Sequence, residues 1–94
     1  MIFGKGRLVI DGVDTEKIEY NLEVSRGLRV KASGYIYGDT DLLIKAFKAK
    51  SLQIQRADLN HLITIVITNV GIEGRAEVFV SGDPGPDNDF HNHP

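Results

Sequence analysis

The chain has no cysteine among its 94 residues, which excludes disulfide scaffolds, cysteine-ligated zinc and thiol catalysis. It also has little excess charge of one sign, since 11 basic and 13 acidic residues give a formal net charge of −2. Such a balance provides no general attraction to nucleic acid or to acidic lipid. A chain of this length forms one domain with a small core, because it buries only about 60–65% of its unfolded surface.

Long hydrophobic runs are absent as well. The longest apolar region, residues 62–70, is interrupted by Thr64, Thr68 and Asn69, and it falls short of the ~18 apolar residues of a membrane span. Glycine and basic residues at positions 4–7 interrupt the apolar stretch that a signal peptide requires. We therefore expect a soluble, cytoplasmic protein that does not contact a membrane.

The C-terminal residues differ in character from the rest. Residues 83–94 are rich in turn formers and carry three aspartates but no lysine or arginine. A segment with so little apolar surface cannot offset its ordering entropy. The sequence predicts a single β-rich domain over residues 1–82, followed by a flexible acidic tail over residues 83–94.

The tail also contains a crude cluster of metal-ligating residue types. These are Asp87, Asp89, His91 and His93, and Phe90 is the one large apolar side chain beside them. A metal site needs fixed geometry and oriented neighbours, which a flexible tail does not provide. We predict no metal site and no cofactor.

Apolar and polar residues alternate over residues 18–36, which is typical of strands with one dry and one wet face. The even-numbered side chains are the apolar ones. A three-residue loop at Ser25–Gly27 would pair Val24 with Leu28 and keep these side chains on one face. Gly27 would then take the left-handed conformation that such loops commonly need.

An earlier strand is predicted over residues 7–11, with Leu8 and Ile10 pointing inward. The pair Asp11-Gly12 favours a two-residue turn. That turn would put Ile10 out of phase with the strand that follows, and a slip of one residue moves every side chain to the other face. We therefore expect a loop of three or five residues, or a bulge.

One helix is predicted, over about residues 40–50. Asp39, Thr40 and Asp41 supply capping oxygens and negative charge at its start, and lysines occur toward its end. Its apolar stripe consists of Leu42, Leu43, Ala46 and Phe47. Such a short helix depends on tertiary packing, and we expect it to close one end or face of the sheet.

Three more strands follow, over residues 51–55, 62–68 and 75–81. The second is apolar and β-branched on both sides, which predicts a central strand that the helix or a second sheet covers on one side. The last has Ala76, Val78 and Val80 on one side, opposite Phe79.

These elements predict a mainly β fold: a small antiparallel β-barrel or two-sheet sandwich of about six strands, with one short α-helix (about 40–50) between strands 3 and 4. This element order resembles that of phage tail-tube and secretion-tube subunits and of some nucleotide-binding barrels. The resemblance concerns element order alone, so no site residue follows from it. It implies, as one possible function, a subunit of a tube-like assembly.

Basic and aromatic residues share the outer face of one predicted strand: Arg29, Lys31, Tyr35 and Tyr37. Such interleaving can bind single-stranded nucleic acid by stacking and phosphate contact. Exposed aromatic residues also mark protein partners, and Phe79 and Phe3 would extend that surface. We favour a non-catalytic binding or assembly module that forms homo-oligomers, with nucleic-acid binding as the alternative.

Other candidates for chemistry have simpler explanations. Asp58 and His61 could form the general base of a small hydrolase, but turn chemistry accounts for both. Asp39 and Asp41 could bind a divalent cation, but helix capping explains them. The Gly4–Gly6 segment lacks the helix that a phosphate-binding loop precedes. The sequence therefore favours a protein that is not an enzyme.

Overall fold

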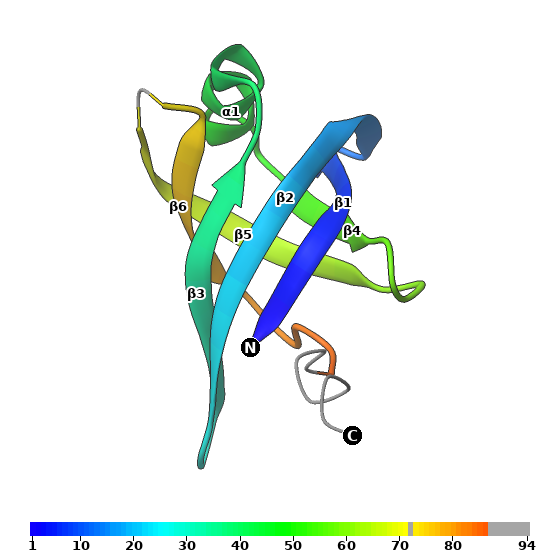
Figure 1. Cartoon of the computed structure of the whole chain (residues 1–94), viewed down its shortest axis with the longest axis vertical. Helices are drawn as coiled ribbons and strands as arrows, with labels where there is room; N and C mark the ends of the chain where they lie inside the picture. Colours follow the sequence, from blue (N-terminus) through cyan, green and yellow to red (C-terminus); the bar gives the residue numbers. More distant parts are fainter. Residues whose placement is uncertain (72, 87–94) are drawn as a thin grey trace.

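The computed structural model describes residues 1–71 and 73–86, which form a closed barrel of six strands and one helix (Figure 1). The elements are β1 (Ile2–Ile10), β2 (Val13–Arg26), β3 (Val30–Tyr37), α1 (Thr40–Phe47), β4 (Leu52–Arg56), β5 (Leu62–Val70) and β6 (Arg75–Val80). Around the barrel the order is β1, β2, β3, β6, β5, β4, and all neighbours are antiparallel. The predicted class is confirmed, and the barrel is the architecture observed.

The barrel interior is built from the apolar half of each alternating strand. Ile18, Tyr20 and Leu22 of β2 and Ile36 of β3 are at most 2% exposed. Isoleucine, valine and alanine side chains from β5 and β6 complete the same cluster. Burial of these side chains is the main force that holds the fold together, and the inward phase predicted for β2 and β3 is confirmed within the barrel.

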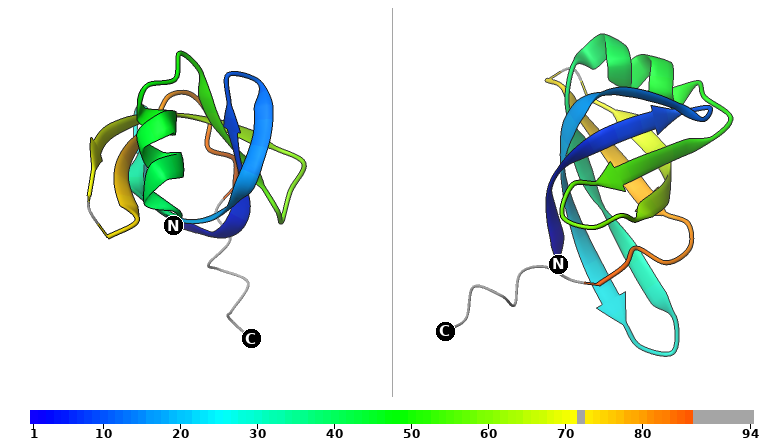
Figure 2. Two further views of the ribbon diagram at one scale, coloured as in Figure 1. Left: turned by 90° about the horizontal axis from the view of Figure 1, so that it is seen from above. Right: turned by 90° about the vertical axis from the view of Figure 1, so that its right-hand side faces the viewer.

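The helix closes one end of the barrel, as expected. Asp39 caps it by accepting a hydrogen bond from the Leu42 amide at 3.2 Å. Leu43 and Ala46 are buried, whereas Phe47 is exposed. Viewed from above, α1 lies across the opening (Figure 2). It ends at Phe47, three residues before the expected end.

Within the described part of the chain, no helix is long and apolar enough to cross a membrane.

Strand β5 lies between β4 and β6 and contacts α1, but its outer face is not covered. Its inner side chains are buried, but Leu62 and Val66 on the outer side are 44% and 55% exposed. A closed barrel has a single interior, and the helix occupies its end. The outer apolar side chains of β5 therefore face solvent.

The first hairpin combines a two-residue turn with a bulge. Ile10 pairs with Val13, and Asp11 and Gly12 have φ values of 49° and 83°, so the rejection of a two-residue turn is wrong. The register then shifts between Arg7 and Val9. This bulge restores the phase, which is one of the solutions expected from the sequence.

The second hairpin is longer than predicted. Arg26 pairs with Val30 and Val24 pairs with Ala32, so the expected pairing of Val24 with Leu28 is wrong. Gly27 does not have a positive φ, and Leu28 is fully exposed at the tip. The shift of four residues leaves the even-numbered phase intact. The β2–β3 hairpin therefore projects beyond the end of the barrel that lies away from α1 (Figure 1).

Candidate functional site

Aromatic side chains gather on the outer surface of β3 and β6. Tyr35 and Tyr37 occupy odd positions of β3, and Phe79 projects from β6 opposite Ser33. Val66 of β5 is the next neighbour of Phe79 across the sheet. We call Tyr35, Tyr37, Val66 and Phe79 the aromatic face. Phe79 is 57% exposed and Tyr37 37%, so the face is open to solvent.

The two tyrosines are held by their neighbours. The Tyr35 and Tyr37 ring centroids are 6.4 Å apart, with the planes tilted by 38°. The guanidinium carbon of Arg75 lies 4.9 Å from the Tyr35 centroid, over the ring. This is a cation–π contact. One side of the Tyr35 ring is thus already occupied by a cation.

A shallow groove separates Tyr35 from Phe79. Ser33 and Gly34 lie along it, and Glu23 and Glu77 are among its lining residues. Carboxylates border the groove, so an anionic ligand such as a phosphate does not suit it, whereas Tyr35 and Phe79 give it apolar walls. The groove therefore extends the aromatic face as a contact surface.

Phe3 adds to this surface from the neighbouring strands. It pairs with Asn21 of β2, which in turn pairs with Tyr35. A second groove is lined by Phe3, Tyr37 and Lys5, among others. The sequence had left Phe3 without a clear core position, and the structure places it 37% exposed on the outer wall.

The remaining predicted site residues lie elsewhere. Arg29 is in the loop of the β2–β3 hairpin, and Lys31 lies on its outgoing strand opposite Ser25. Together with Arg26 they form what we call the basic tip. The five sequence-predicted residues are therefore divided between two regions, with Tyr35, Tyr37 and Phe79 on the aromatic face and Arg29 and Lys31 on the basic tip.

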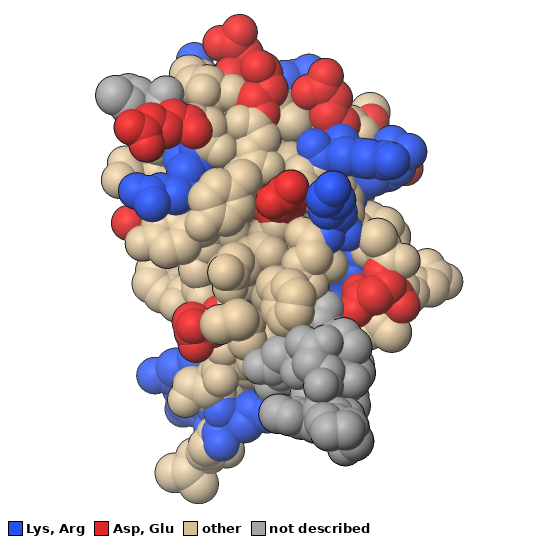
Figure 3. Space-filling model, viewed as in Figure 1, with Lys and Arg blue, Asp and Glu red and all other residues tan. Residues whose placement is uncertain are grey.

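Acidic residues lie in and next to the loops that follow β3 and precede β6, at the end of these strands nearer α1. We call this group the acidic end: Asp39, Asp41 and Glu73. A hydrogen bond of 2.9 Å from the Gly38 amide to the Gly74 carbonyl joins the two loops that carry them. The space-filling view shows acidic groups toward the helix and basic groups at the hairpin tip, with charged groups of both signs between them (Figure 3). The two ends of the face therefore differ in charge, and in this sense we call the face polarised.

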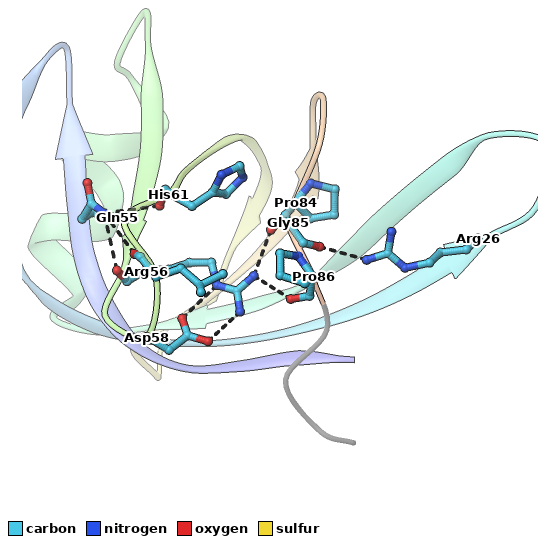
Figure 4. A network of polar contacts seen from close by, with 9 residues as sticks. Arg26, Gln55, Arg56, Asp58, His61, Pro84, Gly85 and Pro86 are labelled. Carbon is cyan, nitrogen blue, oxygen red and sulfur yellow. Dashed lines mark hydrogen bonds and ion pairs between the residues drawn. The ribbon is translucent and has the colours of Figure 1, made fainter. Parts of the chain in front are cut away.

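A second site, which the sequence analysis missed, lies at the end of the barrel away from α1. We call this end the mouth. Arg56, the last residue of β4, is only 2% exposed there. Its Nε and Nη2 donate to the two carboxylate oxygens of Asp58 at 2.9 and 2.6 Å. Its Nη1 donates to the carbonyls of Pro84 and Pro86 at 3.1 and 2.8 Å (Figure 4).

Residues 83–86 cross the mouth as what we call the strap. Pro84 and Gly85 are buried, and the Gly85 carbonyl accepts a hydrogen bond of 2.9 Å from Arg26 Nη2. His61 Nε2 lies 3.1 Å from the Asp83 carbonyl. The first four residues of the predicted tail thus contact the barrel. The boundary at residue 82 stays a prediction.

The rest of the predicted tail lies outside the described residues. The candidate metal-ligating residues Asp87, Asp89, His91 and His93, and Phe90 beside them, all belong to it. Among the residues that the structure describes, no group of three or more His, Asp or Glu side chains is placed to hold a metal ion.

Burial and charge shift two pKa values at the mouth. Burial disfavours the charged form of Arg56, but the hydrogen bonds and charge of Asp58 outweigh it, so the pKa of Arg56 is raised. The pKa of Tyr20 is raised above 10.0, mainly by burial and next by the charge of Asp58, against the opposing effect of Arg56. Tyr20 therefore stays neutral beside a charged pair.

Asp58 and His61 face different partners. The Asp58 carboxylate binds Arg56, whereas the His61 ring lies against the Asp83 carbonyl. The general base that the sequence suggested would need these two groups to bond to each other. Their observed partners give both residues a role in holding the mouth and the strap.

The other sequence candidates have structural roles in the observed fold. Asp39 caps the helix. Gly4 and Gly6 lie within β1, and a Cβ at Gly6 would come within 2.3 Å of the Gln55 carbonyl and 3.1 Å of the Tyr20 ring. Gly6 is therefore needed for the close packing of β1, β4 and Tyr20.

A signal for the mouth was present in the sequence. Leu52, Ile54 and Arg56 alternate with two glutamines, so the phase of β4 directs Arg56 inward. An arginine at an inward position needs several acceptors, and this marks it as part of a polar site. The partners Pro84 and Pro86 have no such signature in the sequence.

Comparison with protein-family models, with curated proteins and with solved structures finds no match to this chain.

Proposed function

We propose that this protein is a non-catalytic assembly module that self-associates through the aromatic face. The observation that carries the proposal is the exposure of Phe79 and Val66, at 57% and 55%, at paired positions of β6 and β5. Exposed apolar patches of this kind typically mark protein contacts. Each strand pairs with a neighbour on both sides in the closed part of the barrel, which favours association through a face over association through a strand edge.

Charge on the same face favours a second copy of this chain as the partner. The basic tip and the acidic end lie on opposite sides of the aromatic face. A two-fold axis that lies in the plane of the contact, across the line from the basic tip to the acidic end, places the basic tip of each copy against the acidic end of the other. Such an isologous contact buries both aromatic faces and pairs opposite charges at both ends.

Single-stranded nucleic acid fits the same surface less well. Arg75 covers one side of the Tyr35 ring, which removes a stacking surface for a base. Glu77 pairs with Tyr35, and Glu19 pairs with Tyr37, so carboxylates lie where phosphates would bind. Nucleic-acid binding is therefore an outcome that the experiment must be able to detect.

Sedimentation of wild type and two matched variants tests the proposal. Phe79→Lys places a charge on the aromatic face, and Phe47→Lys makes the same change at an equally exposed phenylalanine of α1. We expect wild type and Phe47→Lys to dimerise at high micromolar concentration, while Phe79→Lys stays monomeric. The stoichiometry also distinguishes a closed dimer from a larger ring or tube.

Two results would contradict self-association through this face. One is a wild-type protein that stays monomeric at high micromolar concentration. The other is dimerisation that Phe79→Lys leaves unchanged. A monomer that binds an oligonucleotide in a salt-sensitive way, with binding weakened by Tyr35→Ala, would favour the nucleic-acid function instead.

A further inference from the structure

The mouth of the barrel has the features of a peptide-binding site. Arg56 is buried, fixed by two hydrogen bonds to Asp58, and aims its remaining Nη1 at two backbone carbonyls of the strap. Arg26, from the β2–β3 hairpin, binds the carbonyl between them. Three successive carbonyls, those of residues 84, 85 and 86, are thus bound by two arginines from different elements.

The strap matches this arrangement of donors. Pro84 and Pro86 have no N–H group. Their carbonyls can accept hydrogen bonds from a guanidinium, and no backbone donor of these two residues lies beside it. The one N–H between them, that of Gly85, is bound internally by the Asp83 carboxylate at 2.9 Å. The segment Asp-Pro-Gly-Pro therefore presents only acceptors to the mouth.

Backbone conformation and close packing both favour glycine at the centre of this segment. Gly85 has a φ of +85°, which side chains rarely adopt. A Cβ there would lie 3.0 Å from Arg56 Nη1 and 3.1 Å from His61 Cδ2. Gly82 also has a positive φ, of +109°, but a Cβ there would meet nothing within 4 Å. The mouth therefore packs closely against the backbone at Gly85 and leaves open space at Gly82.

We propose that the mouth is a binding site for extended peptides of the Asp-Pro-Gly-Pro type, and that residues 83–86 are its built-in ligand. A tethered ligand has an effective concentration of about millimolar, so the chain's own strap outcompetes the same segment offered by another molecule. A vacated mouth accepts that segment in trans, from a second copy of this chain or from a free peptide.

The test uses the full chain with the strap weakened. Gly85→Ala is compared with Gly82→Ala, which strains the backbone nearby without touching Arg56. The ligand is a capped hexapeptide with the sequence of residues 81–86, and the control peptide has alanine at the Gly85 position. The Arg56 Nε–H and His61 ring signals in NMR spectra report whether the mouth is occupied.

We expect Gly85→Ala to shift both signals away from wild type, and the hexapeptide to return them in a saturable way. The alanine peptide has no such effect, and wild type and Gly82→Ala, whose mouths are occupied, bind neither peptide. Unchanged signals in Gly85→Ala, or a shifted spectrum that no peptide restores, would overturn the proposal.

The test is independent of the proposed self-association. Phe79→Lys alters the aromatic face and leaves the strap and the mouth intact. Combined with Gly85→Ala, it allows peptide binding to be measured in a protein that is monomeric under the proposed function. The hexapeptide restores the same signals in this double variant if the mouth is a peptide site, whether or not wild type dimerises.

Discussion

A buried arginine in a small core needs hydrogen-bond acceptors close to its guanidinium group. Removing a guanidinium from water is tolerated only when its N–H groups find partners nearby. Asp58 supplies a carboxylate to Arg56, and Pro84 and Pro86 supply carbonyls. Tyr20 lies beside this group as a buried hydroxyl whose pKa depends on the same two charges. The protonation state of Tyr20 is therefore tied to the burial and the charges at the mouth.

The raised pKa of Tyr20 predicts a loss of stability at alkaline pH. Below pH 10 the tyrosine is neutral in both states, so its full contribution is present. Above pH 10.0, its ordinary pKa, the unfolded chain releases the proton while folded Tyr20 retains it. The free energy of unfolding therefore falls as the pH rises toward the folded pKa. Urea unfolding on both sides of pH 10 measures this fall.

Tyr20→Phe is the matched variant for this measurement. At neutral pH it removes the polar interaction of the Tyr20 hydroxyl with Arg56, which costs about 1 kcal/mol. It cannot release a proton, so its stability should fall less above pH 10 than that of wild type. Parallel curves for the two proteins would contradict the assigned cause, since the exposed lysines and the other tyrosines are common to both.

At the scale of elements, the alternation of apolar and polar residues predicts which side of a strand faces the core. It predicts less well which residues of two neighbouring strands pair with each other. Within the barrel, the even-numbered apolar residues of β2 and β3 point inward as expected, because side chains alternate with a period of two. The pairing of Val24 with Leu28 and the observed pairing with Ala32 differ by four residues. Both have the same phase, so the pattern cannot distinguish them. The extra hairpin length that follows sets how far the basic tip projects.

Leu22 and Leu28 belong to the same alternating pattern, but the hairpin carries Leu28 out of the barrel. We therefore expect their substitutions to differ in their effect on the free energy of unfolding. Leu28→Ala should change the free energy of unfolding by no more than about 0.5 kcal/mol, because Leu28 is fully exposed. Leu22→Ala should cost about 2–5 kcal/mol, because Leu22 is fully buried in the barrel. Chemical denaturation of both variants measures the difference. Comparable losses would mean that Leu28 packs inside, as the sequence-based register requires.

At the scale of the whole molecule, the sequence predicts an antiparallel barrel or two-sheet sandwich with one helix, and aromatic residues on its outside. It does not predict the contact between Arg56 and the strap, because 28 residues separate Arg56 from Pro84 and no periodic pattern links them. It also grouped Arg29 and Lys31 with the tyrosines, since they share a strand face. Only the length of the hairpin separates the two groups, and this separation produces the polarised face.

The polarised face makes a prediction about pairs of charge variants. Arg29→Glu with Lys31→Glu makes both ends of the face acidic, and Asp41→Lys with Glu73→Lys makes both ends basic. In the two-fold arrangement each double variant repels its own copy, so we expect self-association at least about tenfold weaker than in wild type. Mixed together, the two should form a heterodimer, because each tip then meets an end of opposite charge. Sedimentation of each variant alone and of the mixture measures this.

Attraction between oppositely charged proteins is also possible without the aromatic face. The control for this nonspecific attraction is a triple variant that carries Asp41→Lys, Glu73→Lys and Phe79→Lys. The added Phe79→Lys makes the basic protein more basic, so nonspecific attraction to the acidic variant would persist or increase. Pairing through the face requires the apolar contact at Phe79 as well as the charges, and it should be lost. A complex that survives Phe79→Lys, or charge variants that still self-associate as wild type does, would contradict the two-fold contact across the aromatic face.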